Sequence, residues 1–469
     1  MSAKKLNQEL ILRGNLLKAI LSLAIPVVIN SFLQTMYNLT DTYWLGQIGT
    51  EQLAAINLVS PVQNIIINFG TGITVAGAVL IAQYIGAGAE KDAKVMANQI
   101  FISAMCFALV CAGGCFLATS GIVSWLGAEG ETFLHAKVYL SIVIWDMPFL
   151  YMVNIYSAVN QAQGDTVRPM LLNLCGITLN MILDPILMLG LEMGTAGAAL
   201  ATLLSKAVPA AIALWLLSRP IGDVYLDRSL MKFQSDKLKL ILKIGLPTAI
   251  GGSTMQLGFL LMSRNVYVYG TQAMAAYGIG NKINSVITLP SNAVGSATAT
   301  IVGQNMGAKQ PERSEKSYLI SMVLCVAFLF VGGRILSRDV IATAIVSIFS
   351  KDSEVIAMAA DFLSIMAFWC FTNGVYNASV GLFQGTGHTE VTMAVDATRL
   401  WVFRFLTLWF CENILNMGVR SVWYSVVVSN GISAVILFIL YRRGIWKKSR
   451  IKVEIGGEQQ DNESDAREN

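Results

Sequence analysis

The stretch that decides the fold is Ala24-Ile-Pro-Val-Val-Ile-Asn-Ser-Phe-Leu-Gln-Thr-Met-Tyr-Asn-Leu-Thr-Asp-Thr-Tyr-Trp-Leu-Gly46. It is a long apolar segment with one proline, Pro26, and one acid, Asp41, near its far end. An acid at the centre of a membrane helix costs about 2.5–3.5 kcal/mol on insertion scales, and proline removes a backbone hydrogen-bond donor. Neither feature suits simple anchoring, so the stretch predicts a membrane helix with a mechanistic role. We expect Pro26 to act as its conformational hinge.

Composition places the whole chain in a membrane. Of its 469 residues, 55% are hydrophobic and 13% are charged, whereas about a quarter of the residues of a soluble protein are charged. Apolar runs long enough to cross a bilayer as helices recur twelve times. They cover residues 16–45, 52–84, 95–119, 134–158, 169–190, 195–217, 238–263, 273–303, 317–337, 355–380, 390–411 and 420–441. The sequence therefore predicts an all-α polytopic membrane protein with twelve transmembrane helices.

The two halves of the chain repeat one another at a constant offset of 221 residues. The matching pairs include Ala24 to Pro26 with Gly245 to Pro247, Gln83 with Gln304, Gly86 with Gly307, and Gln163-Gly164 with Gln384-Gly385. Each half holds six expected spans, an even number, so both halves start on the same side of the membrane. This pattern predicts two six-helix lobes related by a parallel pseudo-two-fold repeat, with substrate bound between them.

The charge distribution sets the expected boundaries and orientation. We predict an N-terminal lobe at 1–217, a cytoplasmic linker at 218–237, a C-terminal lobe at 238–443 and a mostly disordered tail at 444–469. Lysine and arginine gather before the first span, in the linker and after the last span. By the positive-inside rule, both termini are expected in the cytoplasm, and the chain is expected to be a multi-pass protein of the plasma (inner) membrane.

A set of short polar motifs runs through the chain in a fixed order. It comprises Tyr37 to Thr42, Gly46 to Ala55, Gln83 to Ala87, Gln163 to Thr166, Gly303 to Ala308 and Gln384 to Gly387. Each motif is weak alone, but their order, spacing and repetition together resemble the multidrug and toxic compound extrusion (MATE) family. The resemblance extends from about Gly14 to Arg443. It implies a two-lobed transporter that exchanges its substrate for a cation.

Four polar residues of the first half are candidates for coupling transport to a cation: Asp41, Asn180, Asp184 and Thr202. Asn180 and Asp184 are four residues apart and share one helix face, and Pro185 disfavours helical geometry at Asp184. Similar family members of the DinF-like branch use an aspartate of the first helix with an asparagine, an aspartate and a threonine of the fifth and sixth. The four residues match this set one by one, so the resemblance implies a site for a proton or for Na⁺.

Structural explanations compete with this interpretation. Asp41 could lie among hydrated lipid headgroups near the helix end, and Asp184 could cap a helix at the outer surface. Asp41 has no counterpart in the second half, where the offset leads to Met262, and this absence favours a function for Asp41. Lys206 could also pair with Asp184 and replace the cation by a fixed ion pair. Asp146 is at most a neighbour of the site.

Charged residues of the second half give a weaker signal. Asp396 and Arg399 are spaced to pair with each other, and Arg404 and Lys282 are expected to face a wet cavity. The NorM-like branch of the family resembles this chain less, because Gln256 stands where an acid is expected in the seventh helix. We therefore expect the coupling chemistry in the first half.

Aromatic and methionine side chains are plentiful near the expected substrate cavity. The candidates for contact with substrate are Met36, Tyr37, Phe69, Tyr139, Met147 and Asn154. Aromatic faces attract organic cations, and methionine adapts to ligands of different shapes. Ordinary packing is the alternative explanation for each of these residues.

Catalytic motifs are missing from the sequence. It contains no Walker A motif, no HExxH and no GxSxG elbow, so neither ATP hydrolysis nor a membrane hydrolase is supported. We predict that the protein is not an enzyme but a cation-coupled (proton or sodium) antiporter that exports amphipathic, often cationic drugs or metabolites by alternating access.

The same prediction names the partners and the rivals. We expect no cofactor beyond the coupling ion, contacts with small organic substrates and membrane lipid, no nucleic acid, and a monomer. One alternative is a lipid-linked saccharide flippase of the same superfamily, which requires a strongly basic cavity. Another is a membrane interaction protein that does not transport.

Overall fold

The computed structural model describes residues 3–220 and 224–448, which are helical almost throughout. The first half contains α1 (Ala3–Leu12), α2 (Leu16–Ile48), α3 (Thr50–Gly86), α4 (Glu90–Trp125), α5 (Gly130–Val143), α6 (Met147–Ala162), α7 (Val167–Pro185) and α8 (Gly194–Leu217). The second half contains α9 (Ser235–Tyr267), α10 (Thr271–Gly307), α11 (Pro311–Leu336), α12 (Asp339–Val346), α13 (Ser353–Trp369), α14 (Phe371–Gly385), α15 (Thr389–Thr398), α16 (Phe405–Asn413) and α17 (Arg420–Arg442). The described residues form no strand, so the predicted all-α fold is confirmed.

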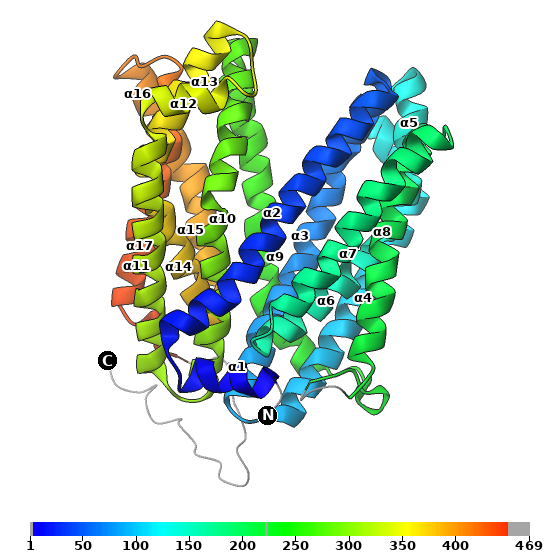
Figure 1. The fold of residues 1–469 in the computed structure, drawn as a ribbon, viewed down its shortest axis with the longest axis vertical. Helices are drawn as coiled ribbons and strands as arrows, with labels where there is room; N and C mark the ends of the chain where they lie inside the picture. Colours follow the sequence, from blue (N-terminus) through cyan, green and yellow to red (C-terminus); the bar gives the residue numbers. More distant parts are fainter. Residues whose placement is uncertain (1–2, 221–223, 449–469) are drawn as a thin grey trace.

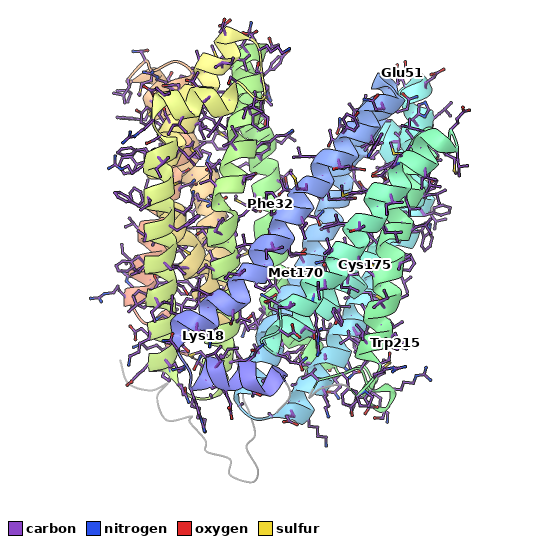
Figure 2. All side chains as sticks on the ribbon, viewed as in Figure 1. Lys18, Phe32, Glu51, Met170, Cys175 and Trp215 are labelled. Atoms are coloured by element: carbon purple, nitrogen blue, oxygen red, sulfur yellow. The ribbon has the colours of Figure 1, made fainter. Side chains whose placement is uncertain are left out.

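The helices form two lobes that stand side by side (Figure 1). The first lobe holds α2 to α8 and the second holds α9 to α17, as the repeat predicts. We call the end with α1 and the last turn of α17 the basal end, and the opposite end the distal end. The lobes meet toward the basal end and diverge toward the distal end. Figure 2 shows Lys18 near the basal end and Glu51 at the distal end of the first lobe.

The number of membrane spans depends on how weak spans are counted. Among the described residues, nine helices are long and apolar enough to cross a membrane, and the bent pair α13–α14 makes a tenth. The predicted spans at 273–303 and 390–411 do not pass that test. The first lies in α10, whose bounds are those of α3 shifted by 221 residues. The second contains Asp396, Arg399 and Arg404, which lower its hydropathy. The repeat, rather than hydropathy, therefore supports the count of twelve.

The linker and the tail are partly described. The linker includes a 3₁₀ turn at Arg228–Leu230 (η3), and it packs back on α4, where the Gln99 amide donates to the Lys232 carbonyl at 2.6 Å. The predicted disordered tail is described only to residue 448, and the rest of it lies outside the described residues.

Helix α2 runs without interruption through Pro26. It begins where the Asn15 side chain accepts the Lys18 backbone N–H at 3.1 Å, which satisfies one of the free donors of the first turn. It ends at Gly49, whose φ of 143° is accessible mainly to glycine. The basal part of α2 packs on the second lobe, with Ala24 in one apolar cluster with Ala293. The role of Pro26 as a hinge stays a prediction.

Backbone contacts close the basal end symmetrically. A Cβ added to Gly86 would lie 1.9 Å from the carbonyl oxygen of Gln304, and a Cβ added to Gly307 would lie 1.9 Å from that of Gln83. The two contacts are related by the 221-residue offset, so α3 and α10 meet about a two-fold axis. Only glycine permits helix backbones to approach so closely, and glycine therefore determines how tightly the lobes meet.

Polar side chains cross between the lobes at the same end. The Gln83 amide donates to the carbonyl of Gly385 at 2.7 Å, and the Gln304 amide donates to the carbonyl of Ala162 at 2.7 Å. Arg313 of α11 donates to the carbonyl of Gly14 at 2.6 Å, which ties α11 to the turn after α1. Each of these donors satisfies a backbone oxygen near a helix end.

We predict that Gly86→Ala and Gly307→Ala each force the basal ends of the lobes apart. The added methyl group would overlap a backbone oxygen, and overpacking of this kind costs about 1–3 kcal/mol. Spin labels attached to the basal ends of α4 and α11 should be farther apart on average in the variants than in the wild type, as measured by double electron–electron resonance spectroscopy. Gly113→Ala in α4 is the control, because a Cβ there meets nothing within 4 Å. Unchanged distances in both basal variants would contradict the closure described above.

Candidate functional site

The predicted cation residues gather in the distal half of the first lobe. Asp41 lies on α2, Asn180 and Asp184 lie on the last turns of α7, and Thr202 lies on α8. Asp184 has 0% and Asn180 has 1% of its surface exposed, whereas Asp41 is half-buried. Asp41 is close enough to Asp184 to interact with it electrostatically. The fold thus brings together two carboxylates that the sequence separates by more than a hundred residues.

The Asn180–Asp184 pair has unused hydrogen-bonding capacity. Both carboxylate oxygens of Asp184 and both polar atoms of the Asn180 amide are buried without a hydrogen-bond partner of good geometry. The two side chains are neighbours, and the polar amide of Asn180 interacts favourably with the Asp184 carboxylate. A buried polar group without a partner costs about 1–3 kcal/mol, and more when it is charged. A proton or a cation bound here would remove that cost.

A break in the helix places these two residues. Pro185 ends the regular part of α7, and the next residues form a π-helical turn, Ile186–Gly190 (η2). Proline cannot donate to the preceding turn, and π-helical turns loosen the backbone ladder. Gly197 of α8 packs directly on this turn, because a Cβ there would lie 2.5 Å from the Leu187 carbonyl oxygen. The turn therefore packs closely against the start of α8.

Thr202 and Asn180 supply neutral ligands of different kinds. The Thr202 hydroxyl donates to the carbonyl of Ala198 at 3.0 Å, which leaves its oxygen lone pairs available. The described residues contain no group of three or more His, Cys, Asp or Glu that could hold a metal ion. The predicted set of two carboxylates, one amide and one hydroxyl is of a different type, and its role as a Na⁺ site stays a prediction.

Lys206 pairs with Asp146 and not with Asp184. The Lys206 ammonium and the Asp146 carboxylate form an ion pair that is 26% and 2% exposed, respectively. Asp146 lies in the 3₁₀ turn Ile144–Asp146 (η1) between α5 and α6, opposite α8. Lys206 also interacts electrostatically with Asp41. The site thus has three acids and one cation, and the ion pair leaves Asp41 and Asp184 without a fixed counter-charge.

The predicted substrate residues divide into two groups. Tyr37 lines a cavity of about 90 Å³ together with Gln34, Asn173, Ser205 and Lys206. Met36 is exposed, Phe69 and Asn154 are half-buried, and Phe69 packs at 6.1 Å from Phe107. Tyr139 is buried but interacts electrostatically with Asp41, Asp146 and Asp184. Tyr37 and Tyr139 thus lie near the acidic cluster, and the role of all five residues in binding substrate stays a prediction.

Met147 belongs to the packed interior. It has 0% of its surface exposed and lies in one apolar cluster with Ile66, Ala112 and Ile144. In this conformation Met147 does not reach a cavity, so the ordinary packing explanation applies to it.

The second lobe has no equivalent of the acidic cluster. Met262, the counterpart of Asp41, is fully buried, and Gln256 is exposed on α9. Asp396 and Arg399 form the expected ion pair at 3.3 Å, and the Tyr376 hydroxyl donates to Asp396. The prediction that the coupling chemistry lies in the first lobe is therefore compatible with the arrangement of these residues, and it stays a prediction.

The expectation of a wet cavity around Arg404 is wrong, because Arg404 is buried and has protein partners. It donates to the Ser429 hydroxyl and to the Asn430 amide oxygen, both at 3.2 Å. It lies at the end of the π-helical turn Arg399–Arg404 (η4). Lys282 on α10 is exposed, and whether it faces a wet cavity stays a prediction.

Sequence spacing could not reveal the Asp146–Lys206 pair. The two residues are separated by 60 positions, and no helical or strand rule links them. The available signal was that each is a lone charge, of opposite sign, in an otherwise apolar span.

A family model described as MatE matches residues 26–186 and 247–410. The chain belongs to the MATE family. Members of this family are membrane transporters, so the prediction of a transporter rather than an enzyme is confirmed. The two matched segments correspond to the two lobes, which explains why the repeat is visible in the sequence.

Individual relatives match most of the length of this MATE protein. A probable multidrug resistance protein NorM of Thermotoga maritima is 25% identical over 445 residues, covering 92% of this chain and 94% of the relative. A multidrug export protein MepA of Staphylococcus haemolyticus is 24% identical over 453 residues, covering 94% and 98%. A solved structure described as the outward-facing conformation of a multidrug resistance MATE family transporter superposes with a TM-score of 0.88 at 25% identity, covering 92% and 97%.

We predict that the Asp146–Lys206 pair stabilises the first lobe. Lys206→Met leaves the Asp146 carboxylate buried and unpaired and should destabilise the protein by about 3 kcal/mol, while Asp146→Asn should cost less, because Lys206 is partly exposed. The double variant Asp146→Asn/Lys206→Met should recover most of the loss. Thermal unfolding in detergent measures the stability of the two single variants and the double variant relative to the wild type. If the losses of the two single variants simply add in the double variant, the pair is not coupled.

Proposed function

We propose that this MATE protein is a cation-coupled antiporter that exports amphipathic, often cationic compounds by alternating access. The observation that carries the proposal is the pair of carboxylates, Asp41 and Asp184, that interact in the first lobe without a fixed counter-charge. Such a pair binds a cation more strongly than either carboxylate alone. The relatives described above are named as multidrug resistance or export proteins, which supports small organic substrates.

The coupling ion acts as a second substrate that competes with the first. A proton or a sodium ion bound between Asp41 and Asp184 would neutralise the charge that attracts an organic cation to Tyr37 and Tyr139. Each ligand would therefore favour a different conformation, in proportion to its difference in affinity for the two states. Because Asp41 is on α2 and Asp184 on α7, ion binding would draw these two helices together at their distal ends.

We propose that the basal end faces the cytoplasm and that the protein resides in the plasma membrane. Basic residues such as Lys239, Arg442 and Arg443 are exposed at the basal end, in agreement with the positive-inside rule. With this orientation, the conformation with a closed basal end is outward-facing. We also propose that the monomer is the transporting unit, since the coupling residues all lie in one lobe.

Cysteine labelling tests the orientation. In a background without native cysteines, a cysteine at Lys239 should react with a membrane-impermeant maleimide only when the cytoplasmic face is accessible. A cysteine at Glu131, exposed at the distal start of α5, should react in intact cells. Labelling of both positions from the same side would contradict the proposed orientation.

The flippase alternative receives less support from the site. A flippase for lipid-linked sugars needs free cations in the cavity, whereas Arg399 and Arg404 are buried and engaged by Asp396, Ser429 and Asn430. The first lobe carries an excess of acids over bases. The geometry therefore favours cationic over anionic substrates.

We predict that Asp41→Asn abolishes gradient-driven export and leaves expression and substrate binding largely intact. Asparagine keeps the size and hydrogen bonding of the side chain but removes the charge that binds the ion. In liposomes loaded with a fluorescent organic cation and given a pH or sodium gradient, the transport rate should fall to background, and Asp184→Asn should impair export similarly.

Met262→Leu is the matched control, because it changes the equivalent buried position of the second lobe, and it should transport at the wild-type rate. Wild-type rates in the Asp41→Asn protein would rule out the proposed coupling. Transport of only anionic lipid-linked sugars by the wild type would instead support the flippase alternative.

A further inference from the structure

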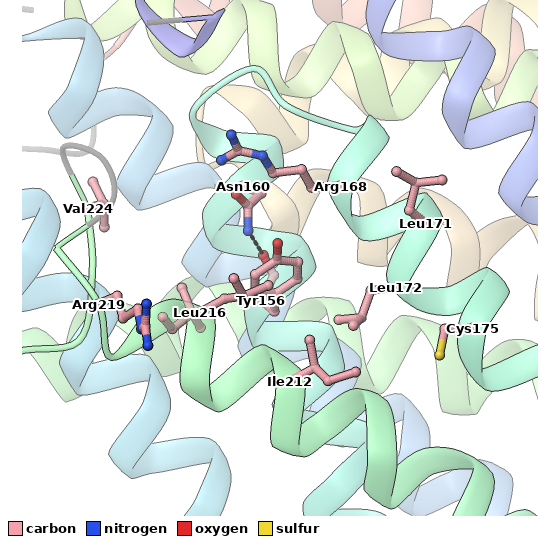
Figure 3. Close-up of a pocket in the computed structure, with 11 residues that line it drawn as sticks. Tyr156, Asn160, Arg168, Leu171, Leu172, Cys175, Ile212, Leu216, Arg219 and Val224 are labelled. Carbon is pink, nitrogen blue, oxygen red and sulfur yellow. Dashed lines mark hydrogen bonds between the residues drawn. The ribbon is translucent and has the colours of Figure 1, made fainter.

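A large cavity opens between α7 and α8 in the basal half of the first lobe (Figure 3). The two helices touch at Gly176, where an added Cβ would lie 3.0 Å from the Ser205 carbonyl oxygen and 3.1 Å from Pro209 Cγ. Basal to this contact they separate, and Tyr156 and Asn160 of α6 form the floor between them. The cavity has a volume of about 500 Å³, which is within the usual range for small-molecule sites.

The mouth of the cavity is basic. Arg168, at the start of α7, and Arg219, after the end of α8, are the charged residues of its lining, and no acid of the described ranges 3–220 and 224–448 lines it. Figure 3 shows the Arg168 side chain above Asn160 and the Arg219 side chain next to Leu216, with Tyr156 and Asn160 between the two arginines. Arg219 lies over the ring of Trp215 at 3.9 Å, which orients it without neutralising it.

One acid lies close to this mouth. Asp165 pairs with Arg168 at 3.3 Å, but its other oxygen accepts the backbone N–H groups of Val167 and Arg168, both at 3.1 Å. The carboxylate of Asp165 is thus shared between the first turn of α7 and the guanidinium. Among the described residues Arg219 forms no ion pair, so these residues give the mouth a net positive charge.

The walls of the cavity are apolar and continue to the outer surface of the lobe. Leu171 is 53% exposed and Ile212 is 38% exposed, and Cys175 between them is also exposed. Trp215 is 53% exposed next to the arginine mouth. Tryptophan at the boundary between apolar and basic surfaces is typical of the membrane interface. The cavity therefore opens sideways into the leaflet at the basal end.

We propose that this cavity binds an anionic phospholipid of the basal leaflet. The phosphate group would accept hydrogen bonds from Arg168 and Arg219, and an acyl chain would lie along Leu171 and Ile212. A basic pocket between membrane helices at headgroup level has the chemistry to recognise such a lipid. The two arginines repel an organic cation, so the cavity is not a second site for the exported compound. The apolar walls distinguish it from a site for free phosphate.

The proposed lipid would act on the helices that carry the coupling residues. The same α7 and α8 hold Asn180, Asp184 and Thr202 on the distal side of their contact at Gly176. A lipid bound between their basal ends would stabilise the separation of α7 and α8 there. Because the two helices touch at Gly176, their basal separation would also affect the distance between their distal ends. Lipid binding is a separate property from ion coupling, and it can be measured without any transport.

Native mass spectrometry of the full chain, released from detergent, tests the proposal. Phosphatidylglycerol should bind about tenfold more tightly than phosphatidylcholine with identical acyl chains. The double variant Arg168→Gln/Arg219→Gln should lose this preference. Arg442→Gln/Arg443→Gln is the matched control, because it removes the same charge from the basal end outside the cavity and should keep the preference.

Two further variants distinguish a loss of lipid binding from a loss of folding. Arg219→Gln alone changes an exposed loop residue, so it should weaken phosphatidylglycerol binding severalfold with no change in thermal unfolding of the lipid-free protein. Cys175→Trp should fill the apolar part of the cavity and reduce lipid binding while the arginines remain.

Three results would overturn the proposal. They are equal binding of the two lipids by the wild type, an equal loss of preference in the Arg442→Gln/Arg443→Gln control, and competition by glycerol phosphate at the affinity of the intact lipid. The last result would identify a site for a soluble phosphate instead. The larger cavity of the second lobe, about 590 Å³ between α11, α14 and α17, has no basic lining residue and should bind lipid without a headgroup preference.

Discussion

The close approach of α3 and α10 at the basal end is the constraint on which the arrangement of the two lobes depends. Gly86 and Gly307 each place the backbone of one lobe against a carbonyl oxygen of the other, and the Gln83 and Gln304 side chains bond across the same junction. Since α3 and α10 are long helices, contact near one end and divergence at the other produces the splayed shape in Figure 1. Any change that separates Gly86 and Gly307 from their contacts would therefore alter the distance between the distal ends of the two lobes.

The two lobes share a backbone plan but differ in charge. At the position of Asp41 the second lobe has the buried Met262, and its buried charges, Asp396 and Arg399, neutralise each other. The first lobe leaves Asp41 and Asp184 without a fixed partner, although it uses Lys206 to neutralise Asp146. A repeat that duplicates structure therefore does not duplicate chemistry. Under the proposed mechanism, ion coupling would belong to the first lobe alone.

Helices α7 and α8 connect several features of the first lobe. Their distal ends carry the coupling residues, their contact at Gly176 forms a fulcrum, and their basal ends separate around the cavity of Figure 3. The π-helical turn after Pro185 and the close packing of Gly197 hold the distal part of α7 in one position. Glycines at two points, Gly176 and Gly197, thus allow α7 and α8 to approach each other closely.

Much of this protein was determined by the sequence alone, because membrane helices and parallel repeats leave periodic signals. The apolar runs predicted the helices, the 221-residue offset predicted two matching lobes, and the motifs from Tyr37 onward predicted the family. Asp41, Asn180, Asp184 and Thr202 could be singled out because polar groups are rare in apolar spans. Among the described residues, hydropathy missed α10 and the α15–α16 segment, and the second of these contains Asp396, Arg399 and Arg404, which are largely enclosed by protein.

Only the tertiary structure decided which charges meet. Lys206 is spaced to reach Asp184 along the chain, yet it pairs with Asp146, because the break between α5 and α6 brings that acid opposite α8. Arg404 is enclosed by Ser429 and Asn430 rather than facing water, and Met147 is packed rather than exposed. These outcomes depend on the crossing angles and rotations of helices far apart in sequence. Those are set by the packing of many small contacts, which no local pattern records.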